Sequence, residues 1–324
     1  MEKAQVDIVI PVYNAPEATE ACIRSVYRHL NGLFGKIFIH EDKSPDEAVR
    51  GVLKRLSTEY LSLDVVYSPV NLGFAGAVNA GVARSSAPYV LVLNSDVVAK
   101  NDCISRVVST LNRDPVIAAV NVAGERFYRV DFSSYIQTDG FVESNNLSGY
   151  AFLIRWVAFD QAGGFDISYG RGYYEDNELS RTLIRLGWKI GIQIDTSIDH
   201  KHQGSFSSVK CVSALIQNNR KKYYSRHPDA AKKVLVIGGK ETYADISAEN
   251  IGMLDRVVSG GGRVFWMTNK HFLLPNTGFK FVKKSTFRIF KLLHARKGSD
   301  RKITNVVVLP SCSWFKKWLV GWMS

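Results

Sequence analysis

Apolar residues in the first two thirds of the chain form short continuous runs separated by segments with helical periodicity. The runs Val6–Pro11 and Tyr89–Asn94 are typical of buried strands. Between such runs, apolar positions recur every three or four residues, as in the segment that Pro16 opens, which favours amphipathic helices. The pattern predicts strands at 6–11, 36–40, 64–67, 89–94, 117–122, 147–154 and 189–194, and helices at 16–30, 45–56, 75–83, 101–111, 157–162, 176–186 and 209–224. Alternating units of this length predict a mostly parallel, doubly wound α/β sheet, whose ligands bind beyond the carboxyl ends of the strands.

Polar residues and glycines mark the predicted helix ends. Ser44-Pro45-Asp46-Glu47 has the capping-box pattern, with Ser44 as the N-cap and proline at the first helical position. Asn101 is the predicted cap of the helix through Leu111, and Gly187 is placed to end the helix at 176–186. Residues 125–148 are irregular and polar, and we expect hairpins or a long loop over the ligand site.

A second, smaller α/β region follows a boundary near Arg226-His227-Pro228. Strands are predicted at 233–237, 263–268 and 305–309 and a helix at 248–258, which is too few elements for a complete Rossmann domain. We therefore expect one domain at 1–225 and a smaller region at 226–324.

Charge is divided unevenly between the two ends of the chain. The net charge at pH 7 is +12, yet residues 1–204 hold 20 Lys and Arg against 24 Asp and Glu, a balance of −4. Residues 205–324 hold 22 against 6, a balance of +16. Such a basic region is expected to face something anionic, with nucleic acid and a membrane surface as the ordinary candidates.

Composition narrows the class of protein. With 46% apolar and 22% charged residues in a chain of 324, this is ordinary globular composition, which excludes a disordered tail, a collagen and a small disulfide scaffold. The four cysteines are widely scattered, so we expect no cysteine-based zinc site and a reducing compartment. The start lacks the long apolar stretch of a signal peptide. The sequence contains no uninterrupted run of about 18 apolar residues, so we expect no transmembrane helix.

Carboxylates follow two of the predicted strands. Asn94-Ser95-Asp96 ends the apolar run from Tyr89, which places Asp96 where an oxygen ligand can share Mg²⁺ or Mn²⁺ with a diphosphate. The alternative is a turn whose polar side chains bond their own backbone. Glu41 and Asp42 follow the second strand and either accept hydrogen bonds from a nucleobase or ribose, or stabilise a helix N-terminus.

Glycines recur between Asn71 and Gly81, at a predicted loop-to-helix start. Backbone N–H groups there suit a phosphate, although close packing of the helix on the sheet explains the small residues equally well. The segment has neither the Walker pattern nor the spacing of dinucleotide-binding loops.

Three carboxylates, Glu175, Asp176 and Glu178, crowd the start of the helix predicted at 176–186. Clustered carboxylates repel one another, which can raise one pKa toward that of a general base; simple capping charges are the alternative. A segment rich in glycine and tyrosine at 169–174 precedes them and suits a mobile substrate loop. His200 and His202 alternate on an extended segment, so at most one is expected to enter a metal or phosphate site.

Taken in order, these segments resemble family 2 inverting glycosyltransferases with the GT-A fold, over roughly residues 5–210. The carriers are Ile8–Asn14, Glu41–Ser44, Asn71–Gly76, Asn94–Asp96, Gly163–Asp166, Glu175–Ser180 and Gly187-Trp188. Asn71–Gly76 and the Asn-x-Asp motif look most like bacterial rhamnosyltransferase-type members. The resemblance implies a doubly wound mixed sheet and a metal-dependent hexosyltransferase. Such an enzyme would move a sugar from a dTDP- or UDP-sugar to a glycan or lipid-linked acceptor in bacterial surface polysaccharide synthesis.

The same resemblance implies a role for each matching residue. The nucleotide-sugar donor would be bound by Pro11, Tyr13, Glu41, Asp42, Asn71, Gly73 and Asn94. Asp96 would bind Mg²⁺ or Mn²⁺ together with His202, with His200 as the second choice. Asp176 would be the catalytic base, and Glu175, Glu178 and Trp188 are candidates for the acceptor side. Glu41, Asn94 and Glu178 depart from the family pattern, which usually has Asp at these positions.

Two other classes of protein remain open on sequence. A sugar nucleotidyltransferase shares the α/β sheet but needs a glycine-rich basic loop after the first strand, which Pro11-Val12-Tyr13-Asn14 is not. A non-catalytic nucleic-acid-binding module is favoured by the basic region, but no nucleic-acid motif occurs there and we expect no such partner.

The region 226–324 is expected to be either a partial second transferase domain or a membrane-association module. As a helix, the last residues would align Trp314, Phe315, Trp318 and Trp322 beside Lys316 and Lys317, which suits a membrane interface. The alternative is that these aromatic side chains pack in a core. The membrane interpretation predicts a cytoplasmic protein, peripheral on the inner face of the cell membrane.

Overall fold

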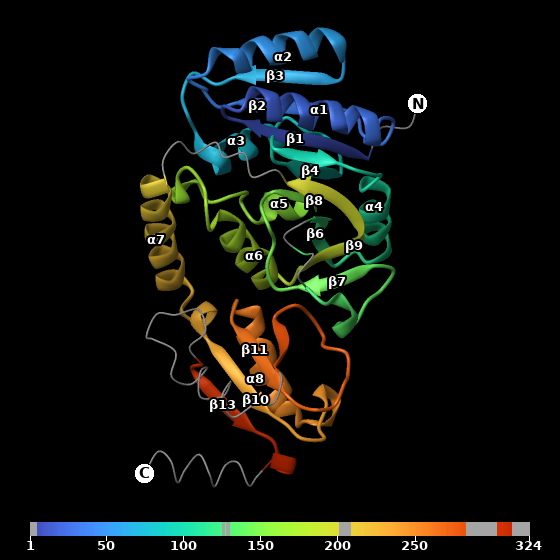
Figure 1. Ribbon diagram of the computed structural model, residues 1–324, viewed down its shortest axis with the longest axis vertical. Coiled ribbons are helices and arrows are strands. Elements are labelled where there is room, and N and C mark those ends of the chain that lie inside the picture. Colours follow the sequence, from blue (N-terminus) through green and yellow to red (C-terminus); the bar gives the residue numbers. More distant parts are fainter. Residues whose placement is uncertain (1–4, 125–126, 128–129, 201–208, 283–302, 313–324) are drawn as a thin grey trace. The chain divides into compact units, whose positions relative to one another are not determined.

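The computed structural model describes residues 5–124, 127, 130–200, 209–282 and 303–312, and it divides into two compact units (Figure 1). The first unit comprises residues 1–131, 138–142 and 146–221, and the second comprises 132–137, 143–145 and 222–324. The division falls at Lys221 and Lys222, close to the expected position at 225 and 226. The two short segments before residue 146 belong to the second unit, which the sequence pattern did not indicate.

A mixed sheet forms the centre of the first unit. Its strands are β1 (Val6–Val12), β2 (Ile37–Glu41), β3 (Leu63–Tyr67), β4 (Tyr89–Leu93), β5 (Val97–Ala99), β6 (Ile117–Gly124), β7 (Phe141–Ser144), β8 (Ala151–Arg155) and β9 (Lys189–His200). The order is β3-β2-β1-β4-β8-β6-β9-β5, with β7 paired to β9. Strands β1 to β4 pair in parallel, whereas β8 is antiparallel to β4 and β6, and β5 is antiparallel to β9. The α/β fold with a mixed sheet is therefore confirmed, and the parallel strands bring their carboxyl ends to one edge.

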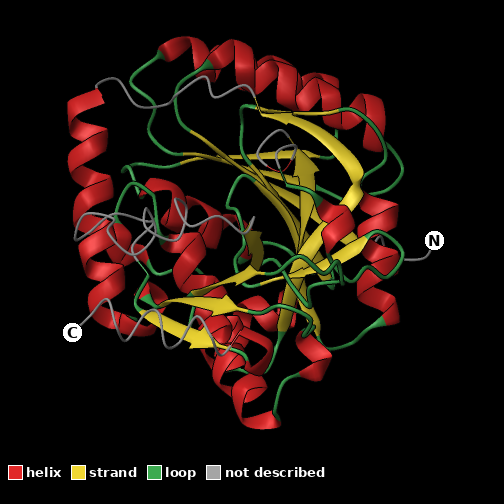
Figure 2. Ribbon diagram, turned by 60° about the horizontal axis from the view of Figure 1, so that its bottom comes forward, coloured by secondary structure: helices red, strands yellow, loops and turns green. Residues whose placement is uncertain are grey.

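Helices cover both faces of this sheet (Figure 2). They are α1 (Pro16–Leu30), α2 (Glu47–Glu59) and α4 (Ile104–Arg113) on one face, and α3 (Gly73–Val82), α5 (Trp156–Gln161) and α6 (Glu175–Arg185) on the other. A further helix, α7 (Val209–Arg226), follows them in the chain. Alternate residues of β1 point to opposite faces: Ile8 and Ile10 pack in a cluster with α1, α2 and α4, and Val9 packs with α3, α5 and α6. These side chains are fully buried, and each such burial contributes roughly 1.5–3 kcal/mol.

Two predicted helix caps are corrected by the structure. The N-cap of α2 is Asp46, whose carboxylate accepts from the N–H of Ala48, because the Ser44 hydroxyl instead accepts from the N–H of Asn14. Helix α4 begins at Ile104, because the Asn101 side chain accepts from the N–H of Ser197.

Two strand boundaries also differ, and both differences lie near the candidate site. Strand β8 begins at Ala151 instead of Leu147, which leaves residues 147–150 as a loop beside the carboxyl end of β4. Strand β9 continues to His200, because its last residues pair with β5, with Val97 opposite His200.

The second unit contains a smaller, fully parallel sheet. Its strands are β10 (Lys233–Ile237), β11 (Arg263–Met267), β12 (Phe279–Val282) and β13 (Asn305–Val308), in the order β12-β11-β10-β13, and helix α8 (Ala248–Ser259) packs on it. Leu235, Trp266 and Phe279 are fully buried, and the Ser247 side chain caps α8. The smaller α/β region is thus confirmed, with β12 as a strand that the pattern did not predict.

Candidate functional site

The first part of the candidate site is the junction between β2 and α3. The buried Asp42 carboxylate accepts from the backbone N–H groups of Leu72 at 2.6 Å and Gly73 at 2.9 Å. The Asn71 side chain donates to the Asp42 carbonyl at 3.0 Å. Burial raises the pKa of Asp42, although the two N–H groups oppose this shift. Asp42 therefore fixes the start of α3. Asp42 and Gly73 are buried, whereas Asn71 and Leu72 are exposed.

Glu41 occupies the last position of β2 and is fully buried. One carboxylate oxygen accepts from the N–H of Ser44, and the other lies 3.8 Å from Nε of Arg50. Pro11 and Tyr13, at the end of the neighbouring β1, are partly exposed. The structure thus brings the expected nucleobase residues to adjacent strand ends, with Glu41 already engaged by the turn that follows it.

Asp96 meets a histidine at the end of β4. One Asp96 oxygen lies 3.1 Å from Nε2 of His200, and the two side chains are 17% and 14% exposed. Asn94 lies at the same strand end, and its Oδ1 is buried without a hydrogen-bond partner in the described part of the chain. His202 lies outside the described residues. The structure therefore brings His200 to Asp96, and the role expected of His202 stays a prediction.

The Asp96–His200 pair fits a divalent cation shared with a ligand. Among the described residues, no group of three or more His, Cys, Asp or Glu side chains could hold a metal by itself. A cation bound to substrate phosphates commonly keeps only one or two protein ligands, so a carboxylate and an imidazole at 3.1 Å form a suitable donor set.

Asp176 lies in the first turn of α6, and three donors orient its carboxylate. Oδ2 accepts from the N–H of Gly149 at 3.1 Å, while Oδ1 accepts from the backbone and side-chain nitrogens of Asn177. Glu178, in the same first turn, accepts from the Tyr169 hydroxyl at 2.6 Å. Asp176 is thus a fixed, partly exposed carboxylate, whereas Glu178 joins α6 to the preceding loop.

The loop Ser148–Tyr150 connects the two halves of the candidate site. The Tyr150 ring stacks on His200, with centroids 5.0 Å apart, and the adjacent Gly149 donates to Asp176. The Tyr150 carbonyl also accepts from the N–H of Asn94. The fully buried side chain of Asn121 fixes this loop, because it donates to the carbonyls of Ser148 and Ala151 and accepts from the N–H of Ser148. Asp96, His200 and Asp176 therefore converge on one short segment.

Glu175 differs from Asp176 in being almost completely buried. Burial raises the pKa of Glu175 to about 8, and the charge of Asp176 adds to the rise. One Glu175 oxygen has no hydrogen-bond partner in the part of the chain that the structure describes. The raised pKa expected from the carboxylate cluster thus falls on Glu175, where it keeps the side chain neutral at pH 7.

Trp188 lies at the opposite edge of the sheet. It precedes the first residue of β9, which pairs with the amino end of β6, and its Nε1 donates to Gln161.

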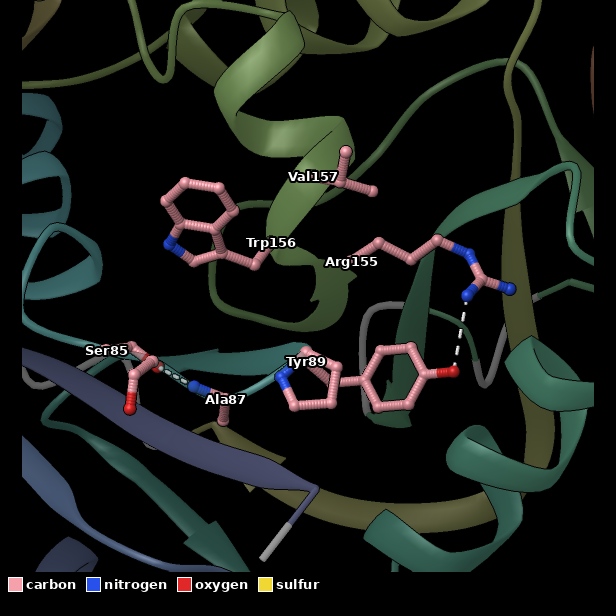
Figure 3. A pocket seen from close by; sticks show the side chains of 8 residues that line it. Ser85, Ala87, Tyr89, Arg155, Trp156 and Val157 are labelled. Carbon is pink, nitrogen blue, oxygen red and sulfur yellow. Dashed lines mark hydrogen bonds between the residues drawn. The ribbon is translucent and has the colours of Figure 1, made fainter. Parts of the chain in front are cut away.

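A pocket of about 560 Å³ also lies at the amino end of β4 (Figure 3), lined by Ser85, Ser86, Ala87, Pro88, Tyr89, Arg155, Trp156 and Val157. It has no acidic lining residue, and Arg155 is bonded to the Tyr89 hydroxyl. The structure therefore does not bring Trp188 or this pocket to Asp96 and Asp176.

Sequence reasoning missed Asn121 and the loop Ser148–Tyr150. The available signal was that a strand antiparallel to β4 must begin beside the carboxyl end of β4, so the residues before it reach the site.

In the described part of the chain, no helix has the length and apolar character that a membrane crossing requires.

A family model described as glycosyl transferase family 2 matches residues 7–173. The chain is similar to pre-mycofactocin glycosyltransferase of Mycobacterium tuberculosis, with 25% identity over 251 residues, covering 72% of this chain and 50% of that protein. It is also similar to glycosyltransferase AglE of Haloferax volcanii, with 24% identity over 107 residues, or 33% and 35% of the two chains. The chain thus spans half or less of the length of these relatives.

Two solved structures share the fold. The mannosyltransferase PcManGT from Pyrobaculum calidifontis, in complex with GDP-Man and Mn²⁺, matches 69% of this chain and 64% of its own, with a TM-score of 0.56 and 14% identity. GalNAc-T7 with UDP, GalNAc and Mn²⁺ matches 78% of this chain and 55% of its own, with a TM-score of 0.55 and 12% identity. At these identities the likeness concerns the fold, and it confirms the expected GT-A type.

Proposed function

Because this chain belongs to glycosyl transferase family 2, we propose that it is a metal-dependent, inverting glycosyltransferase that uses a nucleotide-sugar donor. The donor is a dTDP- or UDP-sugar, and the acceptor is a glycan or lipid-linked sugar of a bacterial surface polysaccharide, as in rhamnosyltransferase-type members. The donor side comprises the ends of β1 and β2, the start of α3 and the end of β4.

One observation supports this proposal most directly. The loop Ser148–Tyr150 bonds the carboxylate of Asp176 on one side and stacks on His200, the partner of Asp96, on the other. A group that removes a proton and a group that binds a diphosphate are both needed in a transferase, and both need fixed positions.

In the proposed reaction, Asp176 accepts the proton of an acceptor hydroxyl. That oxygen attacks the anomeric carbon from the face opposite the nucleotide, through an oxocarbenium-like transition state. Gly149 and Asn177 hold the Asp176 oxygens in place for this proton transfer. Asp96 and His200 would hold Mg²⁺ or Mn²⁺, which when bound neutralises charge on the departing diphosphate.

The acceptor side and cellular location are also part of the proposal. Glu175, Glu178 and the loop before them form the acceptor side of Asp176. The basic region beyond residue 205 attracts an anionic surface, which suits a peripheral protein on the inner face of the membrane that acts on a lipid-linked acceptor. The expected aromatic helix at 313–323 lies outside the described residues.

The test is turnover of a panel of nucleotide sugars with Mn²⁺ by the full chain, compared with Asp176→Asn. Release of nucleoside diphosphate by the wild type, reduced about 10²–10⁴-fold or more in Asp176→Asn, supports the proposal. Binding of UDP or dTDP should persist in this variant, since Asp176 does not bind the nucleotide. Pyrophosphate as the product would favour a nucleotidyltransferase, and no turnover of any donor would favour a binding module.

A further inference from the structure

The side chain of Asn219 reaches from α7 to the loop that precedes Asp176. Its Nδ2 donates to the carbonyl oxygens of Tyr169 at 2.8 Å, Gly172 at 2.8 Å and Tyr173 at 3.0 Å. Asn219 is 6% exposed, whereas its neighbour Asn218 is exposed. A primary amide carries two N–H bonds, so one of them is shared between two of these three carbonyls.

This loop has a backbone conformation that needs external support. Tyr173 and Tyr174 have φ angles of 71° and 79°, a region that bulky side chains rarely adopt. Such conformations persist where the surrounding structure determines them, and they cluster at functional sites. Tyr174 is also the N-cap of α6, where its carbonyl accepts from the N–H of Glu178. The loop conformation therefore sets where α6 begins, and with it the position of Asp176.

The same loop lies against the donor side of the candidate site. A Cβ atom on Gly73 would lie 2.5 Å from the carbonyl oxygen of Gly170 and 3.0 Å from Cα of Arg171. Gly73 is itself bonded to Asp42. The backbone of the loop thus contacts the start of α3 and leads directly into the turn that carries Asp176.

We propose that Asn219 is a positioning residue, which holds the loop Tyr169–Tyr174 and thereby fixes Asp176 relative to the start of α3. The catalytic consequence rests on the proposed function. Asn219 lies outside residues 7–173, which the family model matches, and outside the motifs that carry the family resemblance. Its role follows from three hydrogen bonds and the two residues with positive φ beside them.

The test uses the full chain and the exchange rate of the Gly149 amide hydrogen. Gly149 donates to Asp176 and not to Asn219, so it reports whether Asp176 has moved. In Asn219→Ala, amide exchange of Gly149 and of residues 170–174 should rise at least 10-fold, while the amides of β1 stay protected. The matched control Asn218→Ala, one residue away on the same helix, should match the wild type.

Asn219→Ser, which keeps one donor, is the second variant in case Asn219→Ala does not fold. Unchanged Gly149 exchange in a folded variant overturns the proposal. An equal rise throughout the first unit, or failure of both variants to fold, also overturns it, because Asn219 would then be merely structural.

A kinetic measurement tests the catalytic consequence separately. With a nucleotide sugar that the wild type turns over, kcat of Asn219→Ala should fall at least 10-fold while KM for that donor stays within about 3-fold. An unchanged kcat would contradict positioning. If the wild type turns over no nucleotide sugar, the proposed function fails, and the Gly149 exchange still decides whether Asn219 positions Asp176.

Discussion

At the scale of single residues, Asp96 and His200 form the pair on which metal binding depends in our proposal. One Asp96 oxygen is 3.1 Å from Nε2 of His200, and both side chains keep a small exposed surface. A bound cation would replace this contact by two bonds to the metal. Whether nucleotide binding depends on a metal can therefore be tested by replacing one carboxylate, Asp96.

Asp96→Ala is expected to weaken binding of UDP or dTDP and to remove the effect of Mn²⁺ on that binding. The physical reason is that a cation shared with the diphosphate would lose one of its one or two protein ligands. Calorimetric titration with and without Mn²⁺ measures both effects. Asp160→Ala, an exposed carboxylate on α5, is the control and should behave as wild type. If Mn²⁺ still raised the affinity of Asp96→Ala for UDP or dTDP, Asp96 would have only a structural role in its turn.

The raised pKa of Glu175, about 8, makes the stability of the folded protein depend on pH. The folded protein keeps the proton that the unfolded chain loses near pH 4.5, so the stabilisation is complete below that pH and is lost as the pH rises to 8. Over this window the free energy of unfolding should fall by roughly 1 kcal/mol per pH unit from this group.

Glu175→Gln should lack this slope, so its stability advantage over the wild type should grow between pH 5 and pH 8. Urea unfolding at several pH values measures the difference. Wild-type and variant curves that stay parallel across the window would show that the pKa of Glu175 is ordinary.

At the scale of elements, the contact between the start of α3 and the loop before α6 decides how closely the two halves of the site approach. Gly73 has a φ of 71°, and a side chain there would collide with the backbone of Gly170. Gly32, in the turn after α1, has a φ of 83° with nothing within 4 Å of an added Cβ. The two glycines share the conformation and differ in the surrounding space.

Gly32→Ala should cost about 1–2 kcal/mol of unfolding free energy, the cost of a left-handed residue with a Cβ. Gly73→Ala should cost a further 1–3 kcal/mol because the backbone must shift, and it should also weaken nucleotide binding. Thermal unfolding and titration with UDP and Mn²⁺ measure the two effects. Equal losses of stability in both variants would mean that the loop before α6 moves to accommodate a side chain at Gly73 at no additional energetic cost.

At the scale of the whole molecule, the charge asymmetry is the feature that the fold leaves unexplained. Residues 205–324 carry a balance of +16 and end in the segment with Trp314, Trp318 and Trp322. Each basic residue near an anionic lipid surface can add about 1 kcal/mol, reduced by salt.

The full chain should float with vesicles that contain anionic phosphatidylserine at low salt, and less so at high salt. A chain that ends at Cys312 keeps Ser311, whose N–H bonds Glu241, and should bind more weakly if the last residues insert into the membrane. Equal flotation of both chains would show that the residues after Cys312 do not contribute to membrane binding. No flotation of either chain would exclude membrane association.

The sequence by itself determined the alternation of strands and helices and the presence of carboxylates at the strand ends. Periodicity and strand-end polarity are local properties, so Val6–Val12, Pro16–Leu30 and Asp96 could be placed without knowledge of distant contacts. The tertiary structure alone decided which partners those residues meet. His200 reaches Asp96 because β9 pairs with β5, and Gly149 reaches Asp176 because β8 is antiparallel to β4 and starts at Ala151. Asn219 was invisible in the sequence, because its three acceptors are backbone carbonyls, which every residue carries and no sequence pattern distinguishes.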